Sequence, residues 1–268
     1  MVLSSQRTIY GIDLQLSMLI GKEYKPLPNT TLNEKFDIIA NKELPPKTYP
    51  KLQYYTIGTG GLDILNKLQQ FKINTHKVTD GALYNHAPFI MREIDQDLTP
   101  LERLPYRFRK KLMINNKEYY AYYLKLIPNI DMKDAIFKIT KSADTNKLSL
   151  FDTTSDLILN PVPTNKDISD STLAEYVSKS AKLEFSLTTT ELREVTKATE
   201  ILYGEARSIT EIGICTGHDD KDDNGNKEAS NVQINYFTHI DVNTVNKVNE
   251  ERDLMRAINI GGLEPYVN

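Results

Sequence analysis

The sequence predicts an α+β fold that is mostly antiparallel β, with a few amphipathic helices and long extended arms. Three observations predict it. Runs of β-branched and aromatic residues recur on both sides of short polar turns, which is typical of β-hairpins. One stretch, residues 189–204, has apolar residues at helical spacing and ends in glycine. Five prolines lie between residues 26 and 50, where each restricts the backbone and removes an amide donor.

Bulk composition narrows the class of protein. The chain has 268 residues, of which 40% are hydrophobic and 26% charged, as in an ordinary globular protein of one large or two small domains. No apolar run approaches the ~20 residues of a membrane span, and the N-terminus lacks the pattern of a signal peptide. The net charge of −3 argues against a dedicated nucleic-acid binder, because such domains are usually basic. The lone Cys215, between apolar neighbours, is expected to be a buried thiol and not a nucleophile.

Residues 1–50 are predicted to form an extended N-terminal arm with short ordered elements. Such an arm either lies across a neighbouring subunit or wraps around its own domain, and the sequence leaves both open. Tyrosine occurs 15 times and tryptophan is absent. Because tyrosine combines a large contact area with a polar tip, it suits interfaces as well as cores. Tyr10 and Tyr24 are therefore candidate interface residues in the arm.

Residues 51–160 are predicted to be a β-rich core region, which opens on YYTIGTGGLDILN. Here a strand enters Gly58, Gly60 and Gly61, and a helix is expected over 62–71. A dinucleotide fingerprint would need a third glycine where Asp63 stands, and a phosphate-binding loop would need a lysine that is missing. A nucleotide-binding enzyme is therefore the weaker alternative. The glycines are better interpreted as positions where φ is positive or where two chain segments approach closely.

Three further local patterns follow in the same region. Thr99 and Pro100 are placed as the cap and first residue of a short helical turn. Asn115–Asn116 separates two β-rich runs and predicts a hairpin. A second hairpin is expected around the polar turn at residues 143–146.

Residues 161–268 are predicted to be an α+β module with the order strand, helix, hairpin, helix. A polar segment with prolines, residues 160–172, marks its boundary. The first helix has Thr189 or Thr190 as its cap and Gly204 just past its end. The hairpin carries an acidic loop at its tip, and the final helix is expected over residues 243–259.

The acidic loop has half of a calcium-loop pattern. Oxygen-bearing side chains alternate before and after a glycine, as in the first nine positions of such a loop, but Asn231 stands where the bidentate glutamate belongs. The alternative is a solvated hairpin tip whose glycine supplies the turn. Calcium is the one possible cofactor, and no other is expected. The candidate ligands are Asp220, Asp222, Asn224, Asn226 and Glu228.

Two other patterns could form functional sites, a histidine–aspartate pair and a cluster of cations. His218–Asp219 could join His239 across the hairpin in a metal site, although a structural role for these histidines is favoured. No serine-hydrolase signature is present. A basic cluster is interpreted as a docking surface for an acidic neighbour, with nucleic-acid binding as the alternative because Tyr106 and Phe108 alternate with the cations. The cluster consists of Arg103, Arg107, Arg109, Lys110 and Lys111.

Several segments carry a resemblance to a class of known proteins. They are MVLSSQRTIYGIDLQLSML, YPKLQYYTIGTGG, DGALYNHAPFIMREIDQDLTPLERLPYRFRKK and EILYGEARSITEIGICTG with INYFTHIDV. These segments resemble virion structural proteins of tailed bacteriophages, in particular neck and baseplate components. The resemblance implies a non-enzymatic subunit that assembles with other virion proteins in a ring or wedge, as a homo-oligomer, through arms and hairpins. It also implies a location in the virion. No membrane partner is expected because no apolar run is long enough, and the net charge argues against nucleic acid as a partner. The alternative is a calcium-binding protein or metal-dependent enzyme built on residues 218–231.

Overall fold

The computed structural model describes most of the chain in two compact units. The described residues are 2–8, 49–64, 71–77, 79–131, 137–140, 148–150, 176–222, 225–240 and 254–265, with 11, 12, 14, 15 and 18. Unit 1 is Met1–Ile127 with Ser186–Met255, and unit 2 is Pro128–Phe185 with Arg256–Asn268. The chain thus passes back and forth between the units, and this division differs from the predicted three-part order. The predicted boundary at 160–172 lies outside the described residues.

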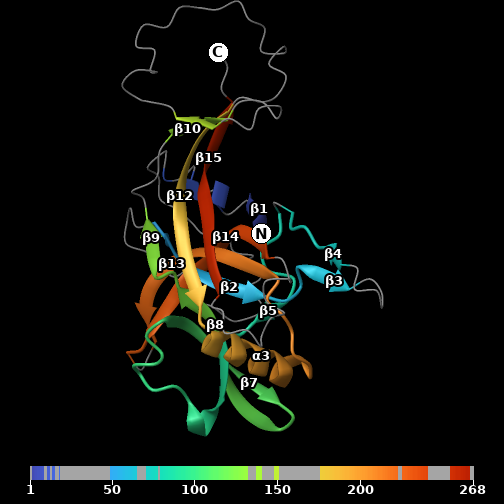
Figure 1. Ribbon diagram of the computed structural model, residues 1–268. Helices are drawn as coiled ribbons and strands as arrows, with labels where there is room; N and C mark the ends of the chain where they lie inside the picture. The colour runs from blue at the N-terminus through green and yellow to red at the C-terminus, as the bar shows by residue number, and fades with distance from the viewer. Residues whose placement is uncertain are drawn as a thin grey trace, which may run out of the picture. The chain divides into compact units, whose positions relative to one another are not determined.

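Unit 1 is built on one sheet whose paired strands are all antiparallel (Figure 1). Its order is β1-β14-β13-β2-β8-β6, with β5 beside β2 and β7 beside β8. The prediction of a mostly antiparallel β fold with few helices is confirmed for the described residues. The bounds are β1 Val2–Arg7, β2 Lys51–Gly58, β5 His86–Ala87, β6 Ile90–Glu93, β7 Tyr106–Ile114, β8 Lys117–Leu126, β13 Glu211–Lys221 and β14 Lys227–Ile240.

The predicted hairpins of unit 1 form where their turn residues predicted them. β7 and β8 pair on either side of Asn115 and Asn116, whose φ angles of 49° and 62° are those of a two-residue turn that matches strand twist. β13 and β14 pair around the acidic loop, which lies at the hairpin tip as predicted. Cys215 on β13 is fully buried, as expected, and burial raises the pKa of its thiol.

Helix α3 (Thr189–Tyr203) is described over its whole length, and its ends follow from local sequence. Thr188 is the cap, one residue before the predicted position, and it exchanges hydrogen bonds with Glu191 in a capping box. The helix ends at Gly204, whose φ of 78° suits glycine. Val195, with its neighbours on one face, is buried where α3 lies against β5 and β6 (Figure 1).

The predicted helix over 62–71 is wrong where the structure describes it. Leu62–Ile64 and Phe71–Ile73 are strands β3 and β4, paired antiparallel with Leu62 opposite Ile73. The amide of Asn74 donates to the carbonyl of Gly61 at 2.9 Å, which closes this ribbon at its base. The turn at residues 58–61, which we call the glycine turn, therefore leads into a two-stranded ribbon. Strand β3 pairs with β4 at the far end of the segment that has helical spacing, and this pairing replaces the predicted helix.

Unit 2 consists of a second antiparallel sheet in the order β11-β10-β12-β15, with β9 beside β12. The predicted hairpin around 143–146 is confirmed by the β10–β11 pair. The predicted final helix is wrong from Leu254 onward, where β15 begins and where Ile258, Asn259 and Ile260 alternate in polarity as in a strand. The bounds are β9 Asn129–Asp131, β10 Phe137–Thr140, β11 Leu148–Leu150, β12 Tyr176–Leu187 and β15 Leu254–Pro265.

The predicted N-terminal arm begins inside the chain's own sheet. β1 pairs with β14, with Arg7 opposite Tyr236, and the amide of Thr8 donates to the carbonyl of Asn235. For residues 2–8 the structure thus supports the alternative in which the arm packs on its own domain. Tyr10 and Tyr24 lie outside the described residues. Within the described part of the chain, no helix has the length and apolarity to cross a membrane.

Candidate functional site

An exposed turn precedes β7, and we call residues 97–105 the leucine turn. Its core is the helical turn predicted from Thr99 and Pro100, closed by a hydrogen bond from the amide of Arg103 to the carbonyl of Thr99 at 3.1 Å. The amide and hydroxyl of Thr99 both donate to Glu102 Oε2, at 2.9 and 2.7 Å. These hydrogen bonds lower the pKa of Glu102 and keep it ionised in the turn.

Both ends of the leucine turn are anchored to the sheet. Asp97 accepts the amide of Leu98 at 2.8 Å and the hydroxyl of Tyr122 at 2.5 Å, and it forms an ion pair with Arg109. At the other end the guanidinium of Arg107 donates to the carbonyl of Leu104. The turn is therefore held in one conformation before any partner binds, which lowers the entropy cost of binding.

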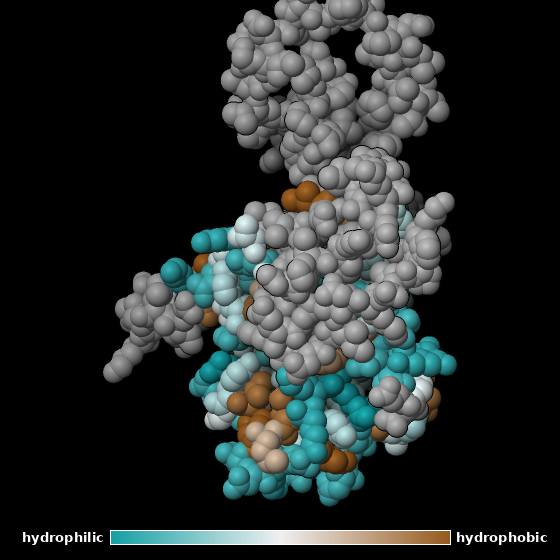
Figure 2. Space-filling view, turned by 180° about the vertical axis from the view of Figure 1, so that it is seen from behind, coloured by the Kyte–Doolittle hydropathy of each residue, from teal (hydrophilic) through white to brown (hydrophobic). Residues whose placement is uncertain are grey.

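The anchored turn presents apolar side chains to solvent. Leu101 is 76% exposed and Leu104 is 49% exposed. Figure 2 shows hydrophobic side chains gathered between hydrophilic ones at the lower end of the described surface, at the height where Figure 1 places β7. A rigid backbone with exposed leucines is typical of a contact surface, because solvent exposure of these side chains costs free energy that a partner can recover.

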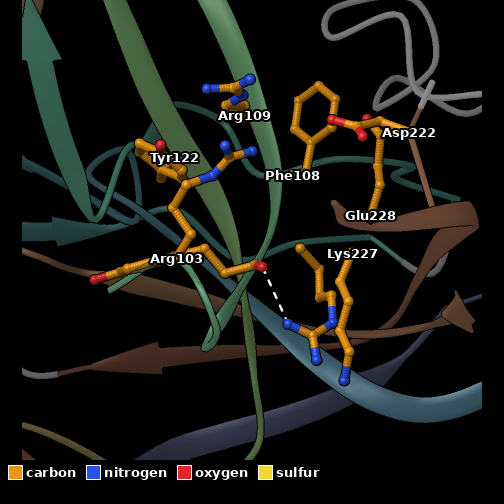
Figure 3. Close-up of a pocket in the computed structure, with 9 residues that line it drawn as sticks. Arg103, Phe108, Arg109, Tyr122, Asp222, Lys227 and Glu228 are labelled. Carbon is orange, nitrogen blue, oxygen red and sulfur yellow. Dashed lines mark hydrogen bonds between the residues drawn. The ribbon is translucent and has the colours of Figure 1, made fainter. Parts of the chain in front are cut away.

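A hollow lies directly behind the turn and joins it to the tip of the β13–β14 hairpin (Figure 3). Its volume of about 90 Å³ is well below the ~300 Å³ at which pockets for drug-sized ligands begin. Its walls bring two predicted regions together, the basic cluster and the acidic loop. The lining residues are Arg103, Tyr106, Arg107, Phe108, Arg109, Tyr122, Asp222, Lys227 and Glu228.

Arg107, a member of the predicted basic cluster, is a structural group. Its side chain is 4% exposed, and its Nε donates to Asp219 Oδ1 at 3.0 Å. The hydroxyl of Tyr54 donates to the same oxygen at 2.6 Å, and burial with this hydrogen bond raises the pKa of Tyr54. Asp219 thus ties β13 to β2 and to the segment that carries the leucine turn. The buried guanidinium serves this junction and is not offered to an outside ligand.

The other cations of the cluster differ in how far they are engaged. Arg109 pairs with Asp97 and lies over the ring of Tyr120 at 4.1 Å, and Lys111 pairs with Glu118 at 2.6 Å. Lys110 is half-buried on β7. Arg103 forms no hydrogen bond or ion pair through its side chain with the described residues, so it is the cation of this cluster that is best placed for a partner. The predicted acidic neighbour stays a prediction, now centred on Arg103.

The acidic loop has the geometry of a hairpin tip. Asp222 accepts the amide of Asn226 at 2.7 Å and its side-chain amide at 2.9 and 3.1 Å, and the amide of Gly225 donates to the carbonyl of Asp222. Gly225 has a φ of 77°, as the predicted turn requires. Asp220 lies opposite Glu228 in the strand pairing, and Asn224 lies outside the described residues.

Among the described residues no group of three histidine, cysteine, aspartate or glutamate side chains is arranged to hold a metal ion. Calcium binding by the acidic loop stays a prediction. The separate idea of a site that joins His218 to His239 is wrong, because His218 pairs with Ser230 while His239 pairs with Glu211 at the other end of β13. At roughly 3.3 Å per residue the two histidines are about 20 Å apart.

The glycine turn surrounds a buried carboxylate that sequence reasoning missed. Glu211 is fully buried, and its Oε1 accepts the amides of Gly60 at 2.8 Å and Asn85 at 3.1 Å. Its Oε2 accepts the amide of Tyr84 at 3.2 Å and pairs with His76 Nε2 at 2.9 Å. The backbone amides of a glycine turn, which in nucleotide sites face a phosphate, here face a side chain of the same chain.

Close approach explains the glycines, as one of the two predicted reasons. A Cβ at Gly60 would lie 2.5 Å from Cβ of Tyr84, and one at Gly58 would lie 2.6 Å from the carbonyl oxygen of Asn85. Neither glycine has a positive φ. The only local signal for the carboxylate was the glycine cluster itself, since its partner Glu211 is 151 residues further along the chain than Gly60.

A protein-family model matches nearly the whole chain. The model of a family of unknown function, DUF7208, matches residues 2–268. No curated protein and no solved structure matches the chain. The matched range includes the leucine turn, the hollow and the glycine turn, together with both units. Because the match covers nearly the whole sequence, the chain belongs to the DUF7208 family.

Proposed function

We propose that the protein is a non-enzymatic structural subunit of a tailed-bacteriophage virion. It assembles with itself and with other virion proteins in a ring or wedge of the neck, tail or baseplate. The leucine turn is one of its contact surfaces. The observation that carries the proposal is the exposure of Leu101 and Leu104 on a backbone that is anchored at both ends.

The energetics of the leucine turn suit this function. Complete burial of a leucine contributes about 1.5–3 kcal/mol, so burial of the area that Leu101 and Leu104 expose would contribute roughly 3 kcal/mol. Since the turn is already ordered, little of this is offset by loss of conformational freedom. The resemblance of several segments to neck and baseplate proteins supports the same conclusion. Arg107 and Arg109 form ion pairs within the chain, and their side chains thereby hold the leucine turn in place.

Quantitative mass spectrometry of purified virions tests the proposal directly. The phage that encodes the chain is grown, and its particles are purified by density-gradient centrifugation and compared with the infected-cell lysate. We expect the protein in the particles at a fixed copy number relative to the capsid protein. Absence from the particles, with abundant protein in the lysate, would overturn the proposal. A second test removes the contact surface: a phage with Leu101→Asp and Leu104→Asp should accumulate incomplete particles.

A further inference from the structure

A second exposed apolar surface lies at the base of the β3–β4 ribbon, and we call Ile73, Asp80 and Tyr84 the tyrosine platform. Ile73 is 43% exposed and Tyr84 is 42% exposed. The hydroxyl of Tyr84 donates at 2.9 Å to the carbonyl of Thr75, two residues after Ile73. Figure 1 places β4 and β7 at different parts of unit 1, so this surface is separate from the leucine turn.

The tyrosine platform is rigid because its ring tops a stack that reaches the core. Tyr84 lies 4.2 Å from the ring of His76 at an interplanar angle of 9°, and His76 lies 4.0 Å from Phe237 at 13°. His76 is held in its plane by Glu211 at 2.9 Å and by Asp80 at 3.2 Å. One face of Tyr84 is thus covered by His76, and the ring is held ready to receive a flat group.

The chemistry of the platform favours a cation on that ring. Asp80 and the buried Glu211 lie beside Tyr84. Burial is the largest cause that raises the pKa of the Tyr84 hydroxyl, and the charges of Asp80 and Glu211 raise it further. A negative potential together with a fixed aromatic face is the setting in which a guanidinium binds by cation–π attraction. Two exposed lysines, Lys72 and Lys77, flank the platform and suit a partner that also carries a carboxylate.

The leucine turn carries the complementary groups. Arg103 has no side-chain hydrogen bond or ion pair with the described residues, and it stands between the two exposed leucines in the sequence. Glu102, next to Arg103, is exposed and ionised. The turn therefore offers apolar groups with one charge of each sign, and the platform offers apolar groups with Asp80 and the two flanking lysines. Two different complementary patches on one chain are what a heterologous, head-to-tail contact requires.

We propose that the leucine turn of one copy of this chain docks on the tyrosine platform of a second copy. Leu101 and Leu104 cover Ile73, and the Arg103 guanidinium lies over the Tyr84 ring beside Asp80. The inference rests on the proposed function and deepens it, since it names the two surfaces through which subunits join head to tail. In such a pair one copy keeps a free platform and the other keeps a free turn, so the contact propagates to a ring or a filament.

Sedimentation velocity with complementary variants tests the pairing. The turn variant is Leu101→Asp with Leu104→Asp, and the platform variant is Ile73→Asp. The control is Met113→Asp on the β7–β8 hairpin, an apolar residue whose exposure lies between those of Leu101 and Leu104. Wild type and control should associate in a concentration-dependent way. Each of the other variants alone should associate at least about 100-fold more weakly, because a carboxylate replaces apolar contact.

The decisive sample is a 1:1 mixture of the turn variant and the platform variant. The intact turn of one can bind the intact platform of the other, so we expect a dimer and nothing larger. A monomeric mixture would overturn the inference, as would a monomeric wild type or turn and platform variants that associate like the control. Tyrosine near-ultraviolet circular dichroism checks that each variant is folded. The test is independent of virion composition, so failure of the pairing and failure of the proposed function are distinguishable.

Discussion

Replacement of Glu211 by glutamine is the sharpest test of the buried cluster. The change keeps the shape of the side chain but replaces one carboxylate oxygen with an NH₂ group, which donates and cannot accept. With the nitrogen at Oε1, the amides of Gly60 and Asn85 lose their acceptor. With the nitrogen at Oε2, the amide of Tyr84 loses its acceptor, whereas the other tautomer of His76 accepts from the new NH₂ group and still donates from Nδ1 to Asp80. In either orientation at least one backbone donor of the cluster is left without an acceptor.

The cost follows from the orientation that leaves fewer donors unsatisfied, in which the Tyr84 amide loses its acceptor. An unsatisfied buried group costs about 1–3 kcal/mol, so we expect Glu211→Gln to lower the free energy of unfolding by roughly 2 kcal/mol. That is a large fraction of the ~5–15 kcal/mol by which a folded protein is usually stable. Urea unfolding at neutral pH, followed by tyrosine near-ultraviolet circular dichroism, measures it. Glu200→Gln on the exposed side of α3 is the matched control and should change stability by less than about 0.5 kcal/mol. A loss below about 1 kcal/mol for Glu211→Gln would refute the assignment of Glu211 as the acceptor of four donors.

Four further predictions concern the glycines, the helix cap, the histidines and the acidic loop. Gly60→Ala should lower the urea midpoint far more than Gly225→Ala, because a Cβ at Gly60 would clash with Cβ of Tyr84. A Cβ at Gly225 meets no atom, so that change costs only the strain of a positive φ, about 1 kcal/mol. Equal effects of the two changes would contradict the close approach at Gly60. Thr188→Ala should cost about 1 kcal/mol in thermal unfolding, with Thr188→Ser close to wild type, as expected for a capping box. Burial, followed by the charge of His76, lowers the pKa of His239, so the stability that comes from its neutral form is present above its unfolded pKa of about 6.5 and declines as the pH falls below it. His239→Gln should flatten the fall in melting temperature between about pH 7 and 5, and an unchanged slope would speak against this role. Because the Asp222 carboxylate is already bonded by Asn226, calcium at about 1 mM should leave the melting temperature unchanged, and a rise abolished by Asp222→Ala would restore the calcium hypothesis.

Features encoded by neighbouring residues could be predicted from the sequence. The Asn115–Asn116 turn, the end of α3 at Gly204 and the hairpin around Gly225 each need only a residue that tolerates positive φ beside the correct polarity pattern. The candidate turn at Thr99 was predictable for the same reason, since Thr99 and Glu102 bond to each other across one helical turn. Its exposure was not, because nothing in LTPLERLP says that the leucines face solvent.

Features that depend on distant pairing could not be predicted. Residues 62–71 have apolar residues at helical spacing, but Leu62 pairs with Ile73 beyond the segment, and the strands form instead. The basic cluster was visible as a run of cations, and Asp97 and Glu118, which pair with Arg109 and Lys111, lie near it in the sequence. The carboxylate that pairs with the buried Arg107 does not, since Asp219 is 112 residues away. A charge pattern along a chain therefore predicts a docking surface only after its internal ion pairs are known.

Each of the two polar clusters of unit 1 holds an exposed apolar surface in place. The glycine turn looks in sequence like a place for a bound anion, and it does hold one, but the anion is the carboxylate of Glu211. The same carboxylate pairs with His76, and the His76 ring stacks on the ring of Tyr84. Arg107 and Asp97 do the equivalent for the leucine turn. The charged groups of both clusters are thus paired inside the chain, where they hold two apolar surfaces in fixed positions. Those two surfaces are the ones that the proposed head-to-tail contact would bring together.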